Sequence, residues 1–182
     1  MSDKDQIVIQ QTKNWVEQIV IGLNLCPFAA QPLQNDGIEF SVNPGDSTEQ
    51  HLHQLADCFT RLDTSADIET SLLIYPDAYQ SFDDYLDMLD IANHLLADLD
   101  YAGTYQIASF HPDYRFEGSA EDDAANFSNR SPYPMLHLIR ESGLEKAIAS
   151  YPDVEQVPEN NIKKLQDIGY EQMQAKLKKI TA

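Results

Sequence analysis

The chain has 182 residues and carries 30 acidic against 12 basic side chains, which gives a formal charge of −18 at pH 7 and a pI near 4.3. A field of this sign repels DNA, RNA and anionic lipid, so binding to nucleic acid or to a membrane surface is excluded to first order. Hydrophobic residues make up 42% of the chain and charged residues 23%, as in globular domains and unlike disordered or fibrous proteins.

The first residues and the cysteine count bear on the cellular location of the protein, and the lack of a linker bears on its number of domains. Residues 1–5 are polar and acidic, unlike the basic start and apolar run of a signal peptide. Two cysteines do not make a disulfide framework, so a cytoplasmic location is predicted. Because no Gly/Ser-rich or Pro-rich linker divides the chain, we expect one globular domain over residues 1–182. Its ends, residues 1–11 and 176–182, are candidates for flexibility.

The first part of the chain predicts a helix, a loop and a strand. Apolar residues recur at helical spacing over residues 5–23, and Gly22 followed by Pro27 closes that pattern. A loop is expected over residues 24–36. The alternating residues 38–42 then predict a strand, which a Pro-Gly turn ends.

The middle of the chain predicts two helices that alternate with two strands. Ser47 is a capping residue for an amphipathic helix whose apolar side continues to Leu62. Residues 70–75 form the clearest strand pattern. Ser81 then caps the longest helical stripe, and residues 104–110 predict a third strand.

The last part predicts a long loop and two helices. Residues 111–132 are irregular, a helix is expected over residues 134–150, and Pro158 introduces a final helix. Strands that alternate with helices predict an α/β domain with a small, mostly parallel sheet of three to four strands, covered by about five helices. A fourth strand is expected in residues 24–36 or 126–132.

The carboxyl ends of the strands are the expected place for a site, because ligands bind there in open parallel sheets. The third strand ends in a His-Pro-Asp sequence that leads into the long loop. Loops beyond about 12–15 residues are uncommon and often functional. We therefore expect His111 to act as general acid or base, oriented by Asp113. The alternative is that His111 hydrogen-bonds a backbone carbonyl.

The same segment concentrates the arginines. Three of the chain's four arginines lie between residues 111 and 140, and no lysine lies between residues 14 and 145. A guanidinium suits carboxylate or phosphate, so we expect a pocket for a small anionic ligand. The expected ligand-binding residues are Tyr114, Arg115, Asn129, Arg130 and Ser131. The alternative is that the arginines pair with nearby carboxylates.

Cys26, in the loop after the first helix, is a candidate nucleophile that would approach the same pocket. It would need a base such as His111 to activate it, and Arg130 could hold the developing negative charge. The alternative is that Cys26 is a small buried residue. The sequence has no CxxC, HxxxH or HExxH motif, so no metal site is predicted, although a metal held by His111, Asp113 and distant carboxylates stays open. The cofactor is left open.

Three motifs carry a resemblance to a known family. They are NLCPFA at residues 24–29, ASFHPDY at residues 108–114, and NRSPYP at residues 129–134 followed by HLIR at residues 137–140. Together they resemble an uncharacterised bacterial family, a domain of unknown function found mainly in proteobacteria, over about Thr12 to Tyr170. The resemblance implies a single-domain cytoplasmic bacterial protein and brings no activity, cofactor or catalytic residue.

Two functions are consistent with this sequence. The first is an enzyme of small anionic metabolites that uses a His/Arg/Cys pocket at the strand ends. The second is a non-enzymatic module that binds a small anion or another protein through the same arginines. A metal hydrolase is a third, weaker hypothesis. Substrate, reaction and oligomeric state are left open.

Overall fold

The computed structural model describes residues 2–45 and 47–182. Its strands are β1 (Ile38–Val42), β2 (Thr70–Ile74), β3 (Tyr105–Phe110) and β4 (Met135–Arg140). Its α-helices are α1 (Asp3–Trp15), α2 (Ala30–Gln34), α3 (Thr48–Thr64), α4 (Phe82–Asp98), α5 (Glu141–Ser150), α6 (Val157–Ile168) and α7 (Tyr170–Thr181). The π-helical η1 (Val16–Ile21) continues α1, and two 3-10 turns, η2 (Ala124–Ser128) and η3 (Val154–Gln156), lie in later loops.

The strands form one mixed sheet in the order β1-β2-β4-β3. β1 and β2 are parallel, whereas β4 is antiparallel to both β2 and β3. β1, β2 and β3 therefore run in one direction and end at the same edge of the sheet. The α/β class and the small sheet are confirmed, but the sheet is mixed rather than mostly parallel. The reason is that the chain returns from β3 through a long loop and enters the gap between β2 and β3 from their carboxyl ends.

β4 lies where the sequence predicted a helix over residues 134–150, and it is in neither segment expected to hold a fourth strand. Met135, Leu136 and Leu138 are buried, on alternating faces of the sheet. A strand covered on both faces reads as a continuous apolar run, which lacks the alternation of a half-exposed strand. The helix that follows begins only at Glu141.

The other predicted strands and the two central helices are confirmed. The observed strands match the expected ranges 38–42, 70–75 and 104–110 to within one residue. Ser47 and Ser81 cap α3 and α4, and their hydroxyl groups accept hydrogen bonds from backbone N–H groups three residues later. An N-cap hydroxyl satisfies a donor that has no partner within the helix, which is why the two starts are well defined in the sequence.

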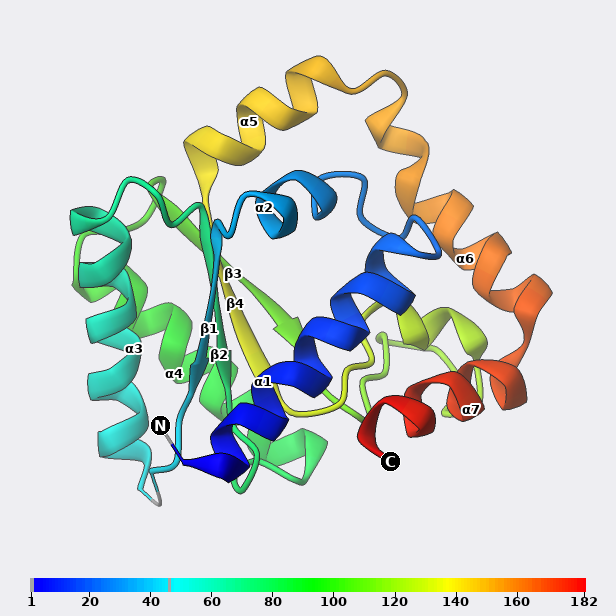
Figure 1. The fold of residues 1–182 in the computed structure, drawn as a ribbon, viewed down its shortest axis with the longest axis horizontal. Helices are drawn as coiled ribbons and strands as arrows, with labels where there is room; N and C mark the ends of the chain where they lie inside the picture. The colour runs from blue at the N-terminus through cyan, green and yellow to red at the C-terminus, as the bar shows by residue number, and fades with distance from the viewer. Residues whose placement is uncertain (1, 46) are drawn as a thin grey trace.

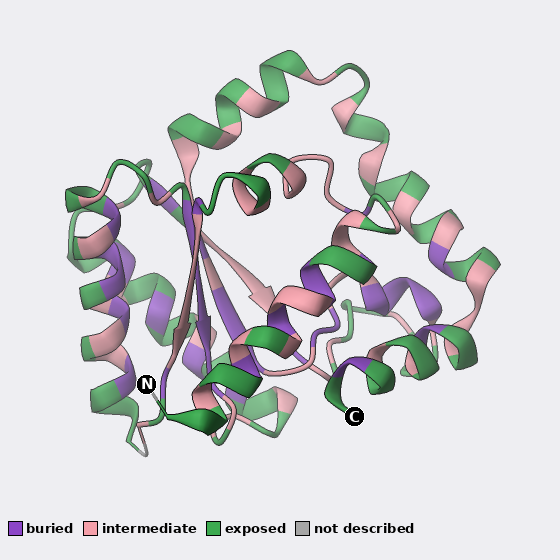
Figure 2. Ribbon diagram, viewed as in Figure 1, coloured by how far each residue is buried: buried purple, intermediate pink, exposed green. Residues whose placement is uncertain are grey.

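Helices cover both faces of the sheet (Figure 1). α3 and α4 pack on one face, where Phe59 and Tyr85 meet Leu73 in one buried cluster. α1, η1, α6 and α7 pack on the other face, where Trp15 and Leu72 belong to a second cluster. Figure 2 shows the buried residues concentrated along the central strands β2 and β4 and on the inner sides of these helices.

The two ends of the chain and α5 differ in their packing. Val8 in α1 and Ile180 in α7 are both buried, so each end lies in a helix that packs on the body. By contrast, none of the described residues of α5 is buried. α5 spans the edge of the sheet near α2, and Figure 2 shows it largely exposed.

Within residues 2–45 and 47–182, no helix combines the length and apolar character needed to cross a bilayer.

Candidate functional site

A pocket of about 760 Å³ lies on the face of the sheet that α1 covers. Its floor is formed by strand residues, which include Ile38, Thr70, Leu72, Phe110, His137 and Ile139. Its walls come from α1 and η1, the turn before α2, and α5, and they include Trp15, Val20, Cys26, Phe28, Leu144 and Tyr151. Pockets for small ligands have volumes of roughly 300–1,000 Å³ and are lined mainly by apolar side chains. We call this one the His137 pocket.

His137 occupies the centre of the floor, because β4 is an inner strand of the sheet. His137 pairs with Leu72 on one side and with Ala108 on the other. Its Nε2 atom lies 2.6 Å from Oγ1 of Thr70, and that oxygen lies 2.6 Å from the carbonyl oxygen of Leu138. Two oxygens this close need a proton between them, so the Thr70 hydroxyl donates to Leu138 and accepts from Nε2–H.

This arrangement fixes the tautomer of the His137 imidazole. The proton sits on Nε2, which leaves Nδ1 with a bare lone pair, and no described residue donates a hydrogen bond to it. Burial of the ring lowers the pKa of His137 to about 4, because a charged imidazolium would lose its hydration there. At pH 7 the pocket floor therefore presents a neutral hydrogen-bond acceptor.

Cys26 lies in the wall of the same pocket, at the turn between η1 and α2. Burial raises the pKa of the Cys26 thiol above its ordinary value, and the backbone amides of Phe28 and Ala29 offset only part of that increase. The side chain is partly exposed. The thiol is therefore protonated at neutral pH, which makes it a weaker nucleophile than an activated cysteine.

His111, the predicted acid or base, is a buried residue with two backbone partners. Its Nε2 atom is 2.9 Å from the carbonyl oxygen of Tyr79, and the backbone N–H of Asp113 donates to Nδ1 over 3.0 Å. Phe82 and Tyr85 pack against the ring. Burial lowers the pKa of His111. Both ring nitrogens hold the start of the long loop in place, which is the alternative that the sequence left open.

Arg130 is buried, with a relative exposure of 4%, and its guanidinium organises the 111–134 loop. Nε donates to the carbonyl oxygen of Tyr114 over 3.1 Å, and Nη2 donates to that of Glu121 over 2.8 Å. The group lies against the rings of Phe127 and Tyr170. Its fork thus joins the two halves of the loop to the start of α7.

The other predicted ligand-binding residues are divided between the loop interior and the surface. The amide of Asn129 donates to the carbonyl of Ser109, and the hydroxyl of Ser131 donates to that of Tyr133. Tyr114 packs on the rings of Phe82 and Phe116. Asp113 and Arg115 are exposed. Among the described residues, Arg115 has no hydrogen-bond or ion-pair partner.

The structure brings the predicted loop residues together but places Cys26 elsewhere. Backbone hydrogen bonds join His111 to Asn129 and Ser131, and Arg130 donates to the carbonyl of Tyr114. Cys26 lines the His137 pocket, whereas neither His111 nor Arg130 is among the residues that line it. The guanidinium of Arg140 is at the opposite edge of the sheet from the 111–134 loop, where it binds the carbonyls of Leu62 and Ser65 at the end of α3. Within the described ranges, no three His, Cys, Asp or Glu side chains are grouped so that they could hold a metal ion.

His137 and Thr70 were not expected to be site residues. His137 is in the segment predicted as helix, where a histidine would not have faced Thr70. A signal was present, because His137 is a lone polar residue within the apolar run of residues 135–139. In a strand covered on both faces, such a residue needs a hydrogen-bond partner, and Thr70 supplies it.

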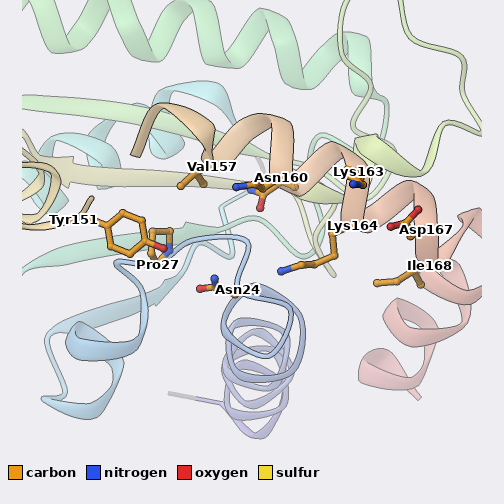
Figure 3. Close-up of a pocket in the computed structure, with 10 residues that line it drawn as sticks. Asn24, Pro27, Tyr151, Val157, Asn160, Lys163, Lys164, Asp167 and Ile168 are labelled. Atoms are coloured by element: carbon orange, nitrogen blue, oxygen red, sulfur yellow. The ribbon is translucent and has the colours of Figure 1, made fainter. Parts of the chain in front are cut away.

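A second groove of about 500 Å³ adjoins the first, and Pro27 and Tyr151 line both. Figure 3 shows Lys164 extending from α6 toward the turn that contains Asn24. Its Nζ donates to the carbonyl oxygen of Leu23 over 2.6 Å, and the amide of Asn161 donates to that of Leu25 over 2.7 Å. These bonds fasten α6 to the end of η1, and so they position the Cys26 turn.

A model of a family described as a protein of unknown function (DUF1415) matches residues 7–175, which include all four strands and the His137 pocket. The chain belongs to the DUF1415 family. No curated protein and no solved structure shows a significant match. The expected membership of an uncharacterised family is confirmed, and DUF1415 brings no activity with it.

Proposed function

We propose that this protein binds a small, largely apolar molecule in the His137 pocket. The observation that carries the proposal is the combination of a ligand-sized apolar hollow with one bare acceptor at its floor. Apolar walls supply most of the affinity of such sites, and a few polar groups fix the orientation of the ligand. α5 forms one wall with no buried residue among those described, so it can move aside at little cost.

This proposal differs from the small-anion hypothesis in its ligand. Arg140 lines the pocket, but its guanidinium is already bonded to the carbonyls of Leu62 and Ser65 in the α3 segment. Lys146 is the one lysine in the lining, and it is exposed on α5. The floor itself carries a lone pair that would repel an anion, so a charged group would be bound only at the rim.

Filling the floor of the pocket tests this proposal. Thermal unfolding of the wild-type protein would be followed with 2-methoxynaphthalene, an apolar probe of suitable size. At ten times its dissociation constant, the probe should raise Tm by about 3–6 °C. Ala108→Leu places a larger side chain in the floor and should abolish the shift.

Ala97→Leu is the matched control, because Ala97 is an exposed residue of α4 outside the pocket. It should retain the full shift. The proposal fails if the probe does not stabilise the wild-type protein, or if both leucine variants respond as the wild type does.

A catalytic role is the second candidate, and the shared location of His137 and Cys26 favours it. A neutral imidazole with a bare Nδ1 is in the protonation state that a general base requires. The enzyme predicted from the sequence would then use His137 in place of His111. The nucleophile is its weaker part, because burial raises the pKa of the Cys26 thiol.

Alkylation of Cys26 distinguishes the two candidates. For the binding protein, we expect iodoacetamide to modify Cys26 slowly at pH 7 and faster as the pH rises, since only the thiolate reacts and burial raises the pKa of the thiol. Substituting His137 by leucine should leave the rate at pH 7 unchanged. Mass spectrometry resolves Cys26 from the fully buried Cys58. Rapid modification at pH 7 that depends on His137 would instead support an activated nucleophile.

A further inference from the structure

The chemistry of the pocket floor selects a particular kind of ligand, and this inference rests on the proposed binding function. We infer that the His137 pocket recognises a small aromatic molecule with one hydrogen-bond donor, a hydroxyl or an N–H group, which it donates to Nδ1 of His137. The molecule's rings would lie against the apolar walls, and its donor would point to the floor.

The donor requirement follows from the hydrogen bonds of His137. The Nε2–H group of His137 already donates a hydrogen bond to the Thr70 hydroxyl. That hydroxyl in turn donates its proton to the carbonyl oxygen of Leu138. In the other tautomer the Thr70 hydroxyl would have to donate to Nε2 and abandon the Leu138 carbonyl, which would leave two oxygens 2.6 Å apart with no proton between them. The imidazole therefore keeps its proton on Nε2 and accepts at Nδ1. A ligand that presents an acceptor or a carboxylate there would set two lone pairs against each other.

The surroundings make that single bond selective. A polar group that loses water in an apolar site without gaining a partner is costly. If a ligand without a hydrogen-bond donor covers the floor of the His137 pocket, Nδ1 loses its water and gains no partner. An analogue of the same shape that lacks the donor should therefore bind more weakly, although it buries the same apolar surface.

Aromatic walls favour an aromatic ligand. Trp15, Phe28, Phe110 and Tyr151 all line the pocket. Trp15 and Phe110 already pack edge to face with their centroids 5.1 Å apart, and Phe28 packs against Tyr151 in the same manner at 5.7 Å. A flat ring that enters between these pairs can add contacts of the same kind, which are worth more than burial of area alone.

A matched pair of probes tests the inference in the unaltered protein. 2-Naphthol carries an O–H donor, and 2-methoxynaphthalene has the same rings with the donor methylated. Equilibrium dialysis at pH 7 should give 2-naphthol about tenfold tighter binding, the difference expected for one hydrogen bond to an otherwise unpaired acceptor. Nitrogen NMR of the labelled protein adds a direct readout, since the Nδ1 resonance of His137 should shift with 2-naphthol and not with the ether.

Two variants complete the test. His137→Leu removes the acceptor and should bring the two affinities within about twofold of each other, while His94→Leu, at an exposed position on α4, should keep the difference. Equal binding of the two probes by the wild-type protein would overturn the donor requirement and leave the proposed function standing. Failure of both probes to bind would overturn the proposed function itself. If His137→Leu does not fold, the wild-type comparison and the Nδ1 shift still decide the matter.

Discussion

Replacing Arg130 by methionine should lower the free energy of unfolding by about 3 kcal/mol, because the buried guanidinium donates to two backbone carbonyls, which then lose this donor. Methionine is similar in length and apolar, so it leaves little cavity behind. It cannot, however, replace the bonds to Tyr114 and Glu121. Arg130→Lys keeps the charge and loses the fork, so it should fall between the methionine variant and the wild type. Urea denaturation measures all three.

Arg115→Met is the control, since Arg115 is an exposed arginine of the same loop. Surface substitutions of this kind usually change stability by less than about 0.5 kcal/mol. An Arg130→Met protein as stable as the Arg115→Met protein would show that the Arg130 guanidinium does not hold the loop together. The residue would then return as a candidate for binding an anion.

The sequence and the structure agree where local signals are sufficient. α3 and α4 each have a serine cap followed by a regular apolar stripe, and β1 to β3 are bounded by polar turns. These features need no knowledge of the tertiary structure. β4 depends on what covers it, because its apolar run becomes a strand only when helices lie on both faces of the sheet. Its direction and position in the sheet could not be read from that run.

The site was harder to predict because hydrogen-bonding side chains can either hold a loop together or bind a ligand. His111, Asn129, Arg130 and Ser131 were singled out as polar residues in a long loop. In the structure their side chains bind backbone carbonyls or amides of that loop and of the segments beside it. A loop of this length has many backbone groups that lie outside helices and strands, and buried groups need partners. Residue type alone does not distinguish this task from binding a ligand.

Cys26 was singled out together with residues that lie elsewhere, and it does line a pocket. The expectation that ligands bind at the carboxyl ends of parallel strands pointed to the other edge of the sheet. The His137 pocket lies over the face instead, toward the edge where β1 and β2 begin and β4 ends. α5 leaves β4 at that edge, so the error in predicting β4 also concealed the pocket.

The stability of the protein should fall by about 3 kcal/mol between pH 6.5 and pH 4 through His137 alone. The folded protein holds the pKa of His137 at about 4, whereas the ordinary value is 6.5. As the pH drops through this window, the unfolded chain takes up a proton that the folded protein does not. Protonation therefore favours the unfolded state, and the contribution is fully present only above pH 6.5. Exposure of the ring to the pocket makes this figure an upper estimate.

Urea denaturation at pH 7.0, 5.5 and 4.5 measures this effect as a difference between proteins. The free energy of unfolding of wild type should fall more steeply than that of His137→Leu, and the two curves should converge or cross on acidification. Some decline should persist in the variant, because burial also lowers the pKa of His111. His94→Leu, which alters an exposed imidazole, should follow the wild-type slope. Parallel curves for wild type and His137→Leu would mean that the imidazole is as well hydrated in the folded protein as in the unfolded chain. The pocket floor would then be too wet to discriminate between ligands with and without a donor.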